Sequence, residues 1–183
     1  MEAPLEPAKV LAVCTGNICR SPAMEFYLER AWGADAVVTS GGTTAAIGWH
    51  IPAPMRTAEE AAGLIVPDHD PLQLDVELIE AQDLVLVAAL SHKEWIARRV
   101  GALPRNTFLL TEAAALATVA RRPVGDSRSG RIRTAAALLG EARSLDDGVH
   151  PDVDDPYLRG DEAYVVAMKE IAANLDVIIE WVG

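Results

Sequence analysis

The feature that most constrains the fold lies near the start of the chain, in residues 10–22. Residues 10–13, Val-Leu-Ala-Val, form a short apolar run of the size of a buried β-strand. The next residues are small and polar, and Pro22 then opens a segment, residues 23–32, with the apolar spacing of a helix. Proline is favoured at the first position of a helix, because its φ is already suitable and the N–H that it lacks would have no partner there. The segment therefore predicts a strand, a tight loop and a helix.

The loop of this unit holds a cysteine, an arginine and a serine at a spacing suited to phosphate chemistry. Five residues separate Cys14 from Arg20, and Ser21 follows. Backbone N–H groups in such a loop can converge on an anion, the helix N-terminus adds positive potential, and an arginine fork can grip two phosphate oxygens. The same potential favours the thiolate form of a nearby cysteine. Cys14 is thus a candidate nucleophile, Arg20 a candidate phosphate ligand and Ser21 a candidate hydrogen-bond donor to the sulfur.

Two other residues of the loop also suit an anion-binding turn. Gly16 allows close approach of the backbone, and Asn17 adopts positive φ more readily than most residues. The alternative is that Cys14 only ends a buried strand as a small apolar residue, which is the usual role of an isolated cysteine. The strand–loop–helix context favours the catalytic interpretation.

Residues 14–22, Cys-Thr-Gly-Asn-Ile-Cys-Arg-Ser-Pro, resemble without interruption the signature loop of the low-molecular-weight protein tyrosine phosphatases. The resemblance implies a phosphotyrosine protein substrate, a phosphate or other oxyanion held in the loop, and a phosphocysteine intermediate on Cys14. It also implies a three-layer α/β sandwich, in which a central four-stranded parallel sheet of order 2-1-3-4 has helices on both faces. The loop residues expected to bind the substrate beside Cys14 and Arg20 are Thr15, Gly16, Asn17, Ile18, Cys19 and Ser21.

A second segment that matches the family follows the next predicted strand. Residues 36–40 read as that strand, and Gly-Gly-Thr after them reads as a turn. The family usually has Ser-Ala-Gly-Thr here, and its serine supports the phosphate loop. The resemblance therefore implies a hydrogen bond between Ser40 and Asn17, whereas the alternative is a serine bonded to nearby backbone.

A third matching segment lies near the C-terminus, where Asp155-Pro156-Tyr157 resembles the family's Asp-Pro-aromatic loop. Transfer of a phosphoryl group from an aryl ester needs an acid that protonates the departing phenoxide, and the same group can then activate water. Asp155 is the expected acid and base, and Tyr157 an aromatic wall of the site. Asp154 is the alternative acid. A solvated or calcium-binding acidic loop is the alternative for the whole segment, although its spacing is not that of an EF-hand.

The loop predicted over residues 44–55 supplies a candidate for substrate preference. The resemblance places this loop at the mouth of the site, where Trp49 would stack on an aryl ring. The family's usual Gly-x-Pro is replaced by His50-Ile51-Pro52, which leaves the alignment of Trp49 open. The alternative is a tryptophan that covers the edge of the core.

The rest of the chain alternates between apolar strand-like runs and helical segments, as in parallel α/β sheets. Ser91, with Glu94 three residues later, predicts a capping box, and His69 and His92 are expected to be structural. We expect one domain over residues 1–183, with a tail at 1–8 and an exposed basic loop insertion at 121–133. The remaining strands are predicted at 83–90 and 107–111, and the helices at 56–64, 75–81, 91–100, 112–120, 132–144 and 162–181.

Composition limits the partners and the compartment. The formal net charge of −11 argues against a nucleic-acid partner, which would require a basic face. No apolar run approaches the length of a membrane span, and residues 1–9 lack the pattern of a secretory signal, so we expect a cytoplasmic protein. The sequence gives no indication of the oligomeric state.

The chain contains two cysteines, Cys14 and Cys19, which are too close in sequence to form a disulfide framework. No zinc-ligand spacing is present, so no metal or other cofactor is expected. In the resembled family the second loop cysteine can bond to the nucleophile and protect it from over-oxidation. The same reversible disulfide between Cys14 and Cys19 is therefore a hypothesis for this chain.

Three alternative functions follow from the same loop. Protein-arginine phosphatases of the family tend to carry threonine where this chain has Ile18, and the apolar Ile18 favours an aryl substrate. Related arsenate reductases need further cysteines downstream, and this chain has none after Cys19. A non-catalytic phosphate-binding module would have lost the nucleophile or the acid, and both are present in the sequence.

Overall fold

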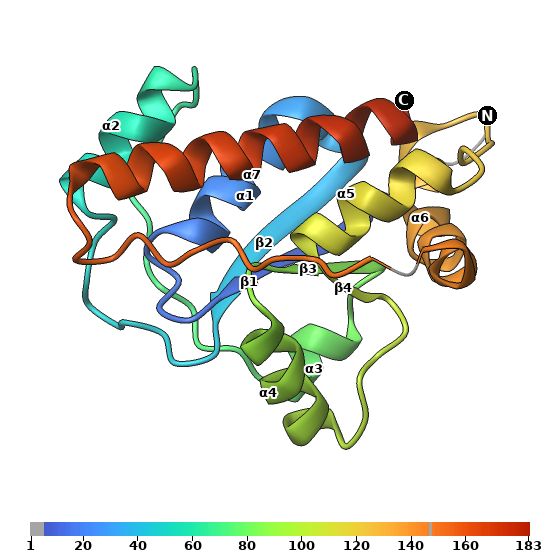
Figure 1. The fold of residues 1–183 in the computed structure, drawn as a ribbon, viewed down its shortest axis with the longest axis horizontal. Helices are drawn as coiled ribbons and strands as arrows, with labels where there is room; N and C mark the ends of the chain where they lie inside the picture. Colours follow the sequence, from blue (N-terminus) through green and yellow to red (C-terminus); the bar gives the residue numbers. More distant parts are fainter. Residues whose placement is uncertain (1–5, 147) are drawn as a thin grey trace.

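The computed structural model describes residues 6–146 and 148–183, and a parallel sheet of four strands runs through its centre (Figure 1). The strands are β1 (Ala8–Cys14), β2 (Ala36–Gly42), β3 (Leu84–Val87) and β4 (Thr107–Leu109). The α-helices are α1 (Arg20–Trp32), α2 (Ala53–Ala61), α3 (Val76–Glu80), α4 (Leu90–Val100), α5 (Leu110–Val119), α6 (Arg128–Ala142) and α7 (Asp161–Val182). Short 3₁₀ helices cover Gly33–Asp35 and Arg143–Leu145.

The strand order is β2-β1-β3-β4, and all neighbouring strands are parallel. Both findings confirm the predicted fold. Because β1 lies between β2 and β3, the loop that follows it emerges near the middle of the carboxyl edge of the sheet. This is the edge at which open α/β sheets bind their ligands.

The alternation of side chains along β1 builds a core on each face of the sheet. Val10 and Ala12 belong to the larger core, which the long helix α7 shares with α1, α5 and α6. Leu11 and Val13 point to the smaller core on the other face, under α3 and α4. Figure 1 shows α3 and α4 on one side of the sheet and α7 with α1 and α5 on the other. The strand residues are apolar on both faces because both faces are covered.

The loop before α7 crosses the carboxyl edge of the sheet and is anchored there by the backbone. The Val153 N–H donates to the Ala88 carbonyl, directly after β3, at 2.8 Å. The Val153 side chain is fully buried in the larger core. This anchor brings residues near the C-terminus to the loop after β1.

The structure corrects two of the predicted boundaries at helix starts. The basic segment 121–133 is not a loop throughout, because α6 begins at Arg128. The Ser127 hydroxyl accepts from the Gly130 N–H at 3.1 Å, so this serine caps the helix and turns the second half of the predicted insertion into its first turns. The predicted capping box of Ser91 and Glu94 is wrong, because α4 begins one residue earlier, at Leu90.

Two smaller differences concern segment ends. Gly41 and Gly42, predicted as a turn, continue β2 and pair with Val13 and Cys14. Within the predicted tail, β1 already begins at Ala8, and residues 1–5 lie outside the described part of the chain.

No helix among the described residues has the length and hydropathy needed to cross a membrane.

Candidate active site

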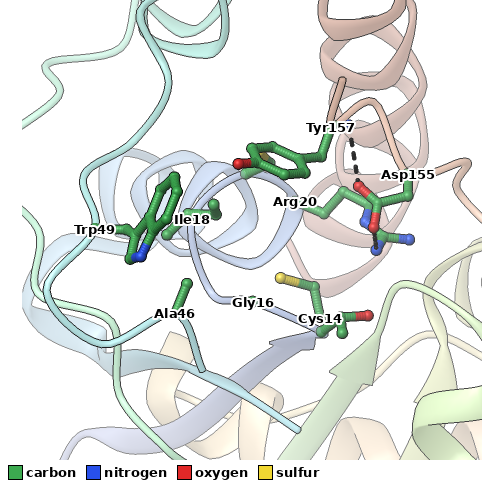
Figure 2. A pocket seen from close by; sticks show the side chains of 10 residues that line it. Cys14, Gly16, Ile18, Arg20, Ala46, Trp49, Asp155 and Tyr157 are labelled. Carbon is green, nitrogen blue, oxygen red and sulfur yellow. Dashed lines mark hydrogen bonds and ion pairs between the residues drawn. The ribbon is translucent and has the colours of Figure 1, made fainter. Parts of the chain in front are cut away.

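A pocket of about 260 Å³ opens at the carboxyl end of β1 (Figure 2). Three segments meet there: the loop after β1, the loop after β2 and the loop before α7. Its lining residues are Cys14, Thr15, Gly16, Ile18, Cys19, Arg20, Ala46, Trp49, Asp155 and Tyr157. The sequence had singled out all of these except Ala46. Of the other predicted site residues, Asn17, Ser21 and Ser40 are buried outside the pocket lining.

The backbone of residues 14–19, here called the Cys14 loop, is oriented by the segment after β2. The carbonyls of Cys14, Thr15 and Gly16 accept hydrogen bonds of 2.9–3.0 Å from the N–H groups of residues 43, 44 and 46. In a planar trans peptide the following N–H points opposite to the carbonyl. The next amides along the loop therefore point away from residues 43–46, which is the arrangement that gathers backbone donors around an anion.

The space for this pairing depends on Gly42. A Cβ on Gly42 would lie 2.5 Å from the Thr15 carbonyl oxygen, so a side chain there would push the Cys14 loop away. Gly16 is different, because its Cβ would meet Ile18 Cγ1 at an ordinary 3.5 Å. The packing around the Cys14 loop therefore requires glycine at position 42, whereas it leaves room for a side chain at position 16.

The sulfur of Cys14 makes two contacts within hydrogen-bond distance. Its Sγ lies 2.9 Å from Ser21 Oγ and accepts from the Asn17 backbone N–H at 3.3 Å. Both contacts hold the sulfur in one position at the carboxyl end of β1. Cys14 also lines the pocket, and its contact with Ser21 is the one expected from the sequence.

The Asn17 side chain anchors the Cys14 loop, of which it is a part, to neighbouring segments. It adopts a positive φ of 54°, as the sequence predicted for this turn. Its Nδ2 donates to Ser21 Oγ at 2.9 Å and to Ser40 Oγ at 2.8 Å, so the expected contact between Ser40 and Asn17 is present. Its Oδ1 accepts from the Leu72 N–H at 2.7 Å, and His69 Nε2 lies 3.2 Å from the same oxygen. These partners fix the loop from two sides and give His69 its expected structural position.

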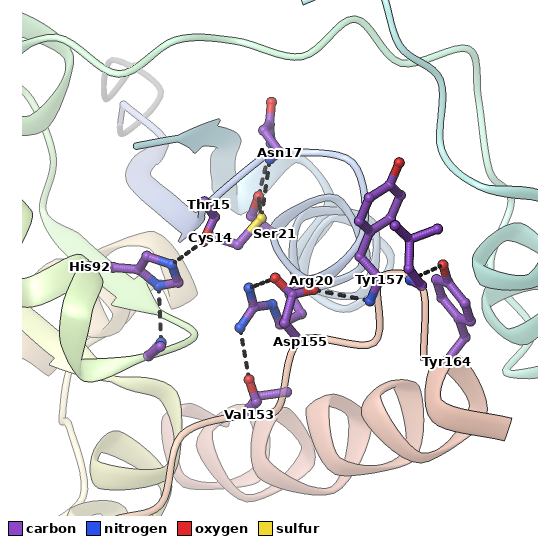
Figure 3. Close-up of polar contacts among 12 residues, drawn as sticks. Cys14, Thr15, Asn17, Arg20, Ser21, His92, Val153, Asp155, Tyr157 and Tyr164 are labelled. Atoms are coloured by element: carbon purple, nitrogen blue, oxygen red, sulfur yellow. Dashed lines mark hydrogen bonds and ion pairs between the residues drawn. The ribbon is translucent and has the colours of Figure 1, made fainter. Parts of the chain in front are cut away.

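Arg20 lies at the first position of α1, with its side chain almost fully buried beside the pocket. Its Nη1 donates to the Val153 carbonyl at 2.9 Å, and its Nη2 pairs with Asp155 Oδ2 at 2.7 Å (Figure 3). Its buried Nε has no acceptor in the described part of the chain. The guanidinium is thus held by one edge and has a donor available for an anion.

The predicted acid and its alternative face different surroundings. Asp155 lines the pocket, and its second oxygen accepts from the Tyr157 N–H at 3.2 Å, which fixes the carboxylate at the pocket edge. Asp154 does not line this pocket; it lines a neighbouring depression with Glu162 and Glu170, to which Asp155 also contributes. Of the two, Asp155 is the one beside Cys14 and Arg20.

Among the described residues, no three His, Cys, Asp or Glu side chains gather as metal ligands would.

The mouth of the pocket has apolar walls. Figure 2 shows the rings of Trp49 and Tyr157 beside the opening, with the Ile18 side chain of the Cys14 loop between them. Trp49 is 60% exposed, so it does not serve as a cover for the core, which was the alternative interpretation. Such walls are suited to an aromatic ring.

The sequence did not predict that His92 would reach the Cys14 loop. Its Nδ1 accepts from the Ala89 N–H at 3.0 Å, so the proton of the neutral ring lies on Nε2, which contacts Thr15 Oγ1 at 2.9 Å (Figure 3). Burial, with the positive charge of Arg20, lowers the pKa of His92 to about 4. His92 therefore caps the start of α4 as a neutral ring and ties Thr15 in place.

The other cysteine, Cys19, is buried, and burial beside Cys14 raises the pKa of its thiol far above the usual range.

The model of the family described as low molecular weight phosphotyrosine protein phosphatase matches residues 9–126 of the chain. The chain belongs to this family. The low molecular weight protein-tyrosine-phosphatase Ptp of Acinetobacter johnsonii is 30% identical over 101 residues, which cover 55% of this chain and 70% of that protein. The protein-arginine-phosphatase of Geobacillus stearothermophilus is 30% identical over 141 residues, 77% of this chain and 93% of that protein.

Solved structures agree with this assignment. The low molecular weight protein tyrosine phosphatase from T. tengcongensis superposes with a TM-score of 0.69 at 26% identity, over 94% of this chain and 98% of that one. The fold, the family and the Cys14 loop together identify a phosphatase domain.

Proposed function

We propose that the protein hydrolyses phosphotyrosine in proteins through a phosphocysteine on Cys14. The observation that carries the proposal is the meeting of Cys14, Arg20 and Asp155 in one pocket whose outer walls are aromatic and apolar. An ester of a phenol needs a nucleophile, a clamp for the phosphate and an acid for the leaving group, and the pocket offers one residue for each role.

The reaction follows from these positions in two steps. Arg20 and the amides of the Cys14 loop bind the phosphate and neutralise its charge. Cys14 Sγ attacks phosphorus, the S–P bond forms, the bond from phosphorus to the phenol oxygen breaks, and Asp155 gives its proton to that oxygen. Asp155 then takes a proton from water, the water oxygen attacks phosphorus, and the S–P bond breaks to give inorganic phosphate and the thiolate.

Ile18, Trp49 and Tyr157 are proposed to select the aryl group. Ile18 is 7% exposed and lines the pocket together with the two rings. A tyrosine ring that enters between them would bury apolar surface, which favours an aryl ester over a charged guanidinium. The runner-up substrate is phosphoarginine, because one relative that this chain nearly spans is named a protein-arginine-phosphatase.

The two substrates can be separated with matched peptides that carry either phosphotyrosine or phosphoarginine. We expect wild type to hydrolyse the phosphotyrosine peptide with the higher kcat/KM, and Ile18→Thr to shift the ratio towards phosphoarginine. Ala46→Ser, at a lining position on the loop after β2, serves as the control and should leave the ratio of the two kcat/KM values unchanged. Preference of the wild type for phosphoarginine would refute the proposed substrate.

We further propose a cytoplasmic location. Cys14 and Cys19 are both free thiols, the form that a reducing compartment maintains. The proposed partners are phosphotyrosine-containing proteins, and no cofactor is assigned to the reaction. Activity that persists unchanged in the presence of a chelator is the expected result.

A further inference from the structure

The N-cap residue of α4 cannot cap the helix with its own side chain. That residue is Ala89, whose methyl group accepts no hydrogen bond. The ring of His92 accepts from the Ala89 N–H at 3.0 Å, and the next amide, the Leu90 N–H, donates to Asp152 Oδ1 at 2.7 Å. A carboxylate near a helix N-terminus is favoured as an acceptor and by the helix dipole. Asp152 thus caps α4 from a segment 62 residues further along the chain.

Asp152 lies in the loop before α7, three residues ahead of Asp155. On either side of it the backbone is also bonded. The Pro151 carbonyl accepts from the Thr111 hydroxyl at 2.7 Å, and the Val153 N–H donates at 2.8 Å to the carbonyl directly after β3. Of these three successive anchors, only that of Asp152 is made by a side chain of the loop. A substitution can therefore remove it and leave the other two in place.

The same turn of α4 also contacts the Cys14 loop. His92 Nε2 lies 2.9 Å from Thr15 Oγ1, one residue after the nucleophile (Figure 3). The negative charges of Asp152 and Asp155 oppose the lowering of the His92 pKa, so both carboxylates lie near this ring. The start of α4 therefore contacts the segment that carries the nucleophile and the segment that carries the acid.

We propose that Asp152 is a positioning residue for the acid, whose carboxylate ties the loop that carries Asp155 to the first turn of α4. In the free protein Arg20 also holds Asp155, through the ion pair of 2.7 Å. This ion pair cannot position the acid during the reaction, since Asp155 must then be protonated and Arg20 binds the phosphate. The position of Asp155 then depends on the anchors at residues 151–153, one of which is the Asp152 side chain.

The proposal rests on the role of Asp155 as the acid, and the dependence of the rate on the leaving group tests it. We compare kcat/KM for phenyl phosphate, whose leaving group is poor, with kcat/KM for p-nitrophenyl phosphate, whose leaving group is good. Asp152→Ala should lower the value for phenyl phosphate by about tenfold, a part of the roughly 10²–10⁴-fold that a general acid contributes. The value for p-nitrophenyl phosphate and the inhibition constant of inorganic phosphate should stay close to wild type, because Cys14 and Arg20 are unchanged.

Two further variants separate the hydrogen bond from the charge. Asp152→Asn keeps an oxygen that can accept from the Leu90 N–H, and asparagine caps helices about as well as aspartate, so the ratio of the two kcat/KM values should stay near that of wild type. Asp68→Ala removes an exposed carboxylate next to His69 and should leave the ratio unchanged. The proposal is overturned if Asp152→Ala keeps the wild-type ratio, whether or not both rates fall. It is also overturned if Asp152→Asn or Asp68→Ala changes the ratio as Asp152→Ala does.

Asp155→Asn in the same assay distinguishes a failure of this proposal from a failure of the proposed function. If Asp155→Asn shows a steep dependence on the leaving group and Asp152→Ala does not, Asp155 is the acid and only the positioning role of Asp152 is wrong. If neither variant shows it, Asp155 is not the acid, and both proposals are wrong.

Discussion

The buried carboxyl group of Glu59 gives a prediction about stability whose size follows from its surroundings. Glu59 lies on α2, is fully buried, and neither of its oxygens has a hydrogen-bond partner in the described part of the chain. Burial raises its pKa from 4.5 to about 8, despite the opposing charge of Arg56. The folded protein thus keeps this proton at neutral pH, whereas the unfolded chain has released it.

The sign and size of the effect follow by linkage. Because the pKa of Glu59 is higher in the folded than in the unfolded state, its stability contribution is complete below pH 4.5 and is lost as the pH rises towards 8. At pH 7 the loss spans about 2.5 pH units, which at 1.36 kcal/mol per unit is roughly 3 kcal/mol. Such a loss is a large part of the free energy of unfolding of an ordinary domain.

Glu59→Gln removes the titration and keeps the shape. In urea unfolding followed by tryptophan fluorescence, its stability relative to wild type should rise by roughly 3 kcal/mol between pH 4.5 and pH 7. Glu80→Gln, at an exposed position at the end of α3, should follow the wild-type curve at every pH. If wild type and Glu59→Gln keep a constant difference across this range, Glu59 is ionised in the folded protein and the reasoning is wrong.

Four other predictions concern the pocket and its supports. Cys14→Ser should abolish hydrolysis of p-nitrophenyl phosphate while the unfolding midpoint stays close to that of wild type. Asp155→Asn should lower kcat by about 10²–10⁴-fold on a phenyl ester with a poor leaving group and much less on p-nitrophenyl phosphate, because only the poor leaving group depends on the acid. Peroxide should join Cys14 and Cys19 in a disulfide seen by mass spectrometry, and inactivation should become irreversible in Cys19→Ser. Finally, His92 has a lowered pKa, so it should cost stability as the pH falls from 6.5 towards 4, and His92→Asn should lose that part of the acid dependence in urea unfolding.

The sequence was informative wherever residue type and chain order determine local structure. The apolar run before Cys14 and the proline after Ser21 predicted strand, loop and helix, and the family resemblance added the strand order. The Gly-Gly-Thr segment after Ser40 was interpreted as a turn. The structural role of these small residues depends on a neighbouring segment, which the local sequence does not reveal. Gly42 is required by the Thr15 carbonyl of another segment, and such a contact has no local signal.

The supports of the site were harder to predict, because they join segments far apart in the chain. His92 was expected to be structural, but its contact with Thr15 crosses 77 residues of sequence. The same holds for Asp152, which looks like one acidic residue among several until the fold places it against the start of α4. The start of α4 was misplaced because Ser91 has the residue type of a cap, whereas the ring of His92 accepts from the Ala89 N–H instead.

The most direct test of the account is to look for the covalent intermediate during turnover. Wild type and Asp155→Asn are mixed with p-nitrophenyl phosphate, quenched within milliseconds, and digested for mass spectrometry. We predict a phosphoryl group on Cys14, at higher occupancy in Asp155→Asn because the variant also activates water poorly in the second step. Turnover without any phosphoryl group on Cys14, or with the group on another residue, would contradict the central claim.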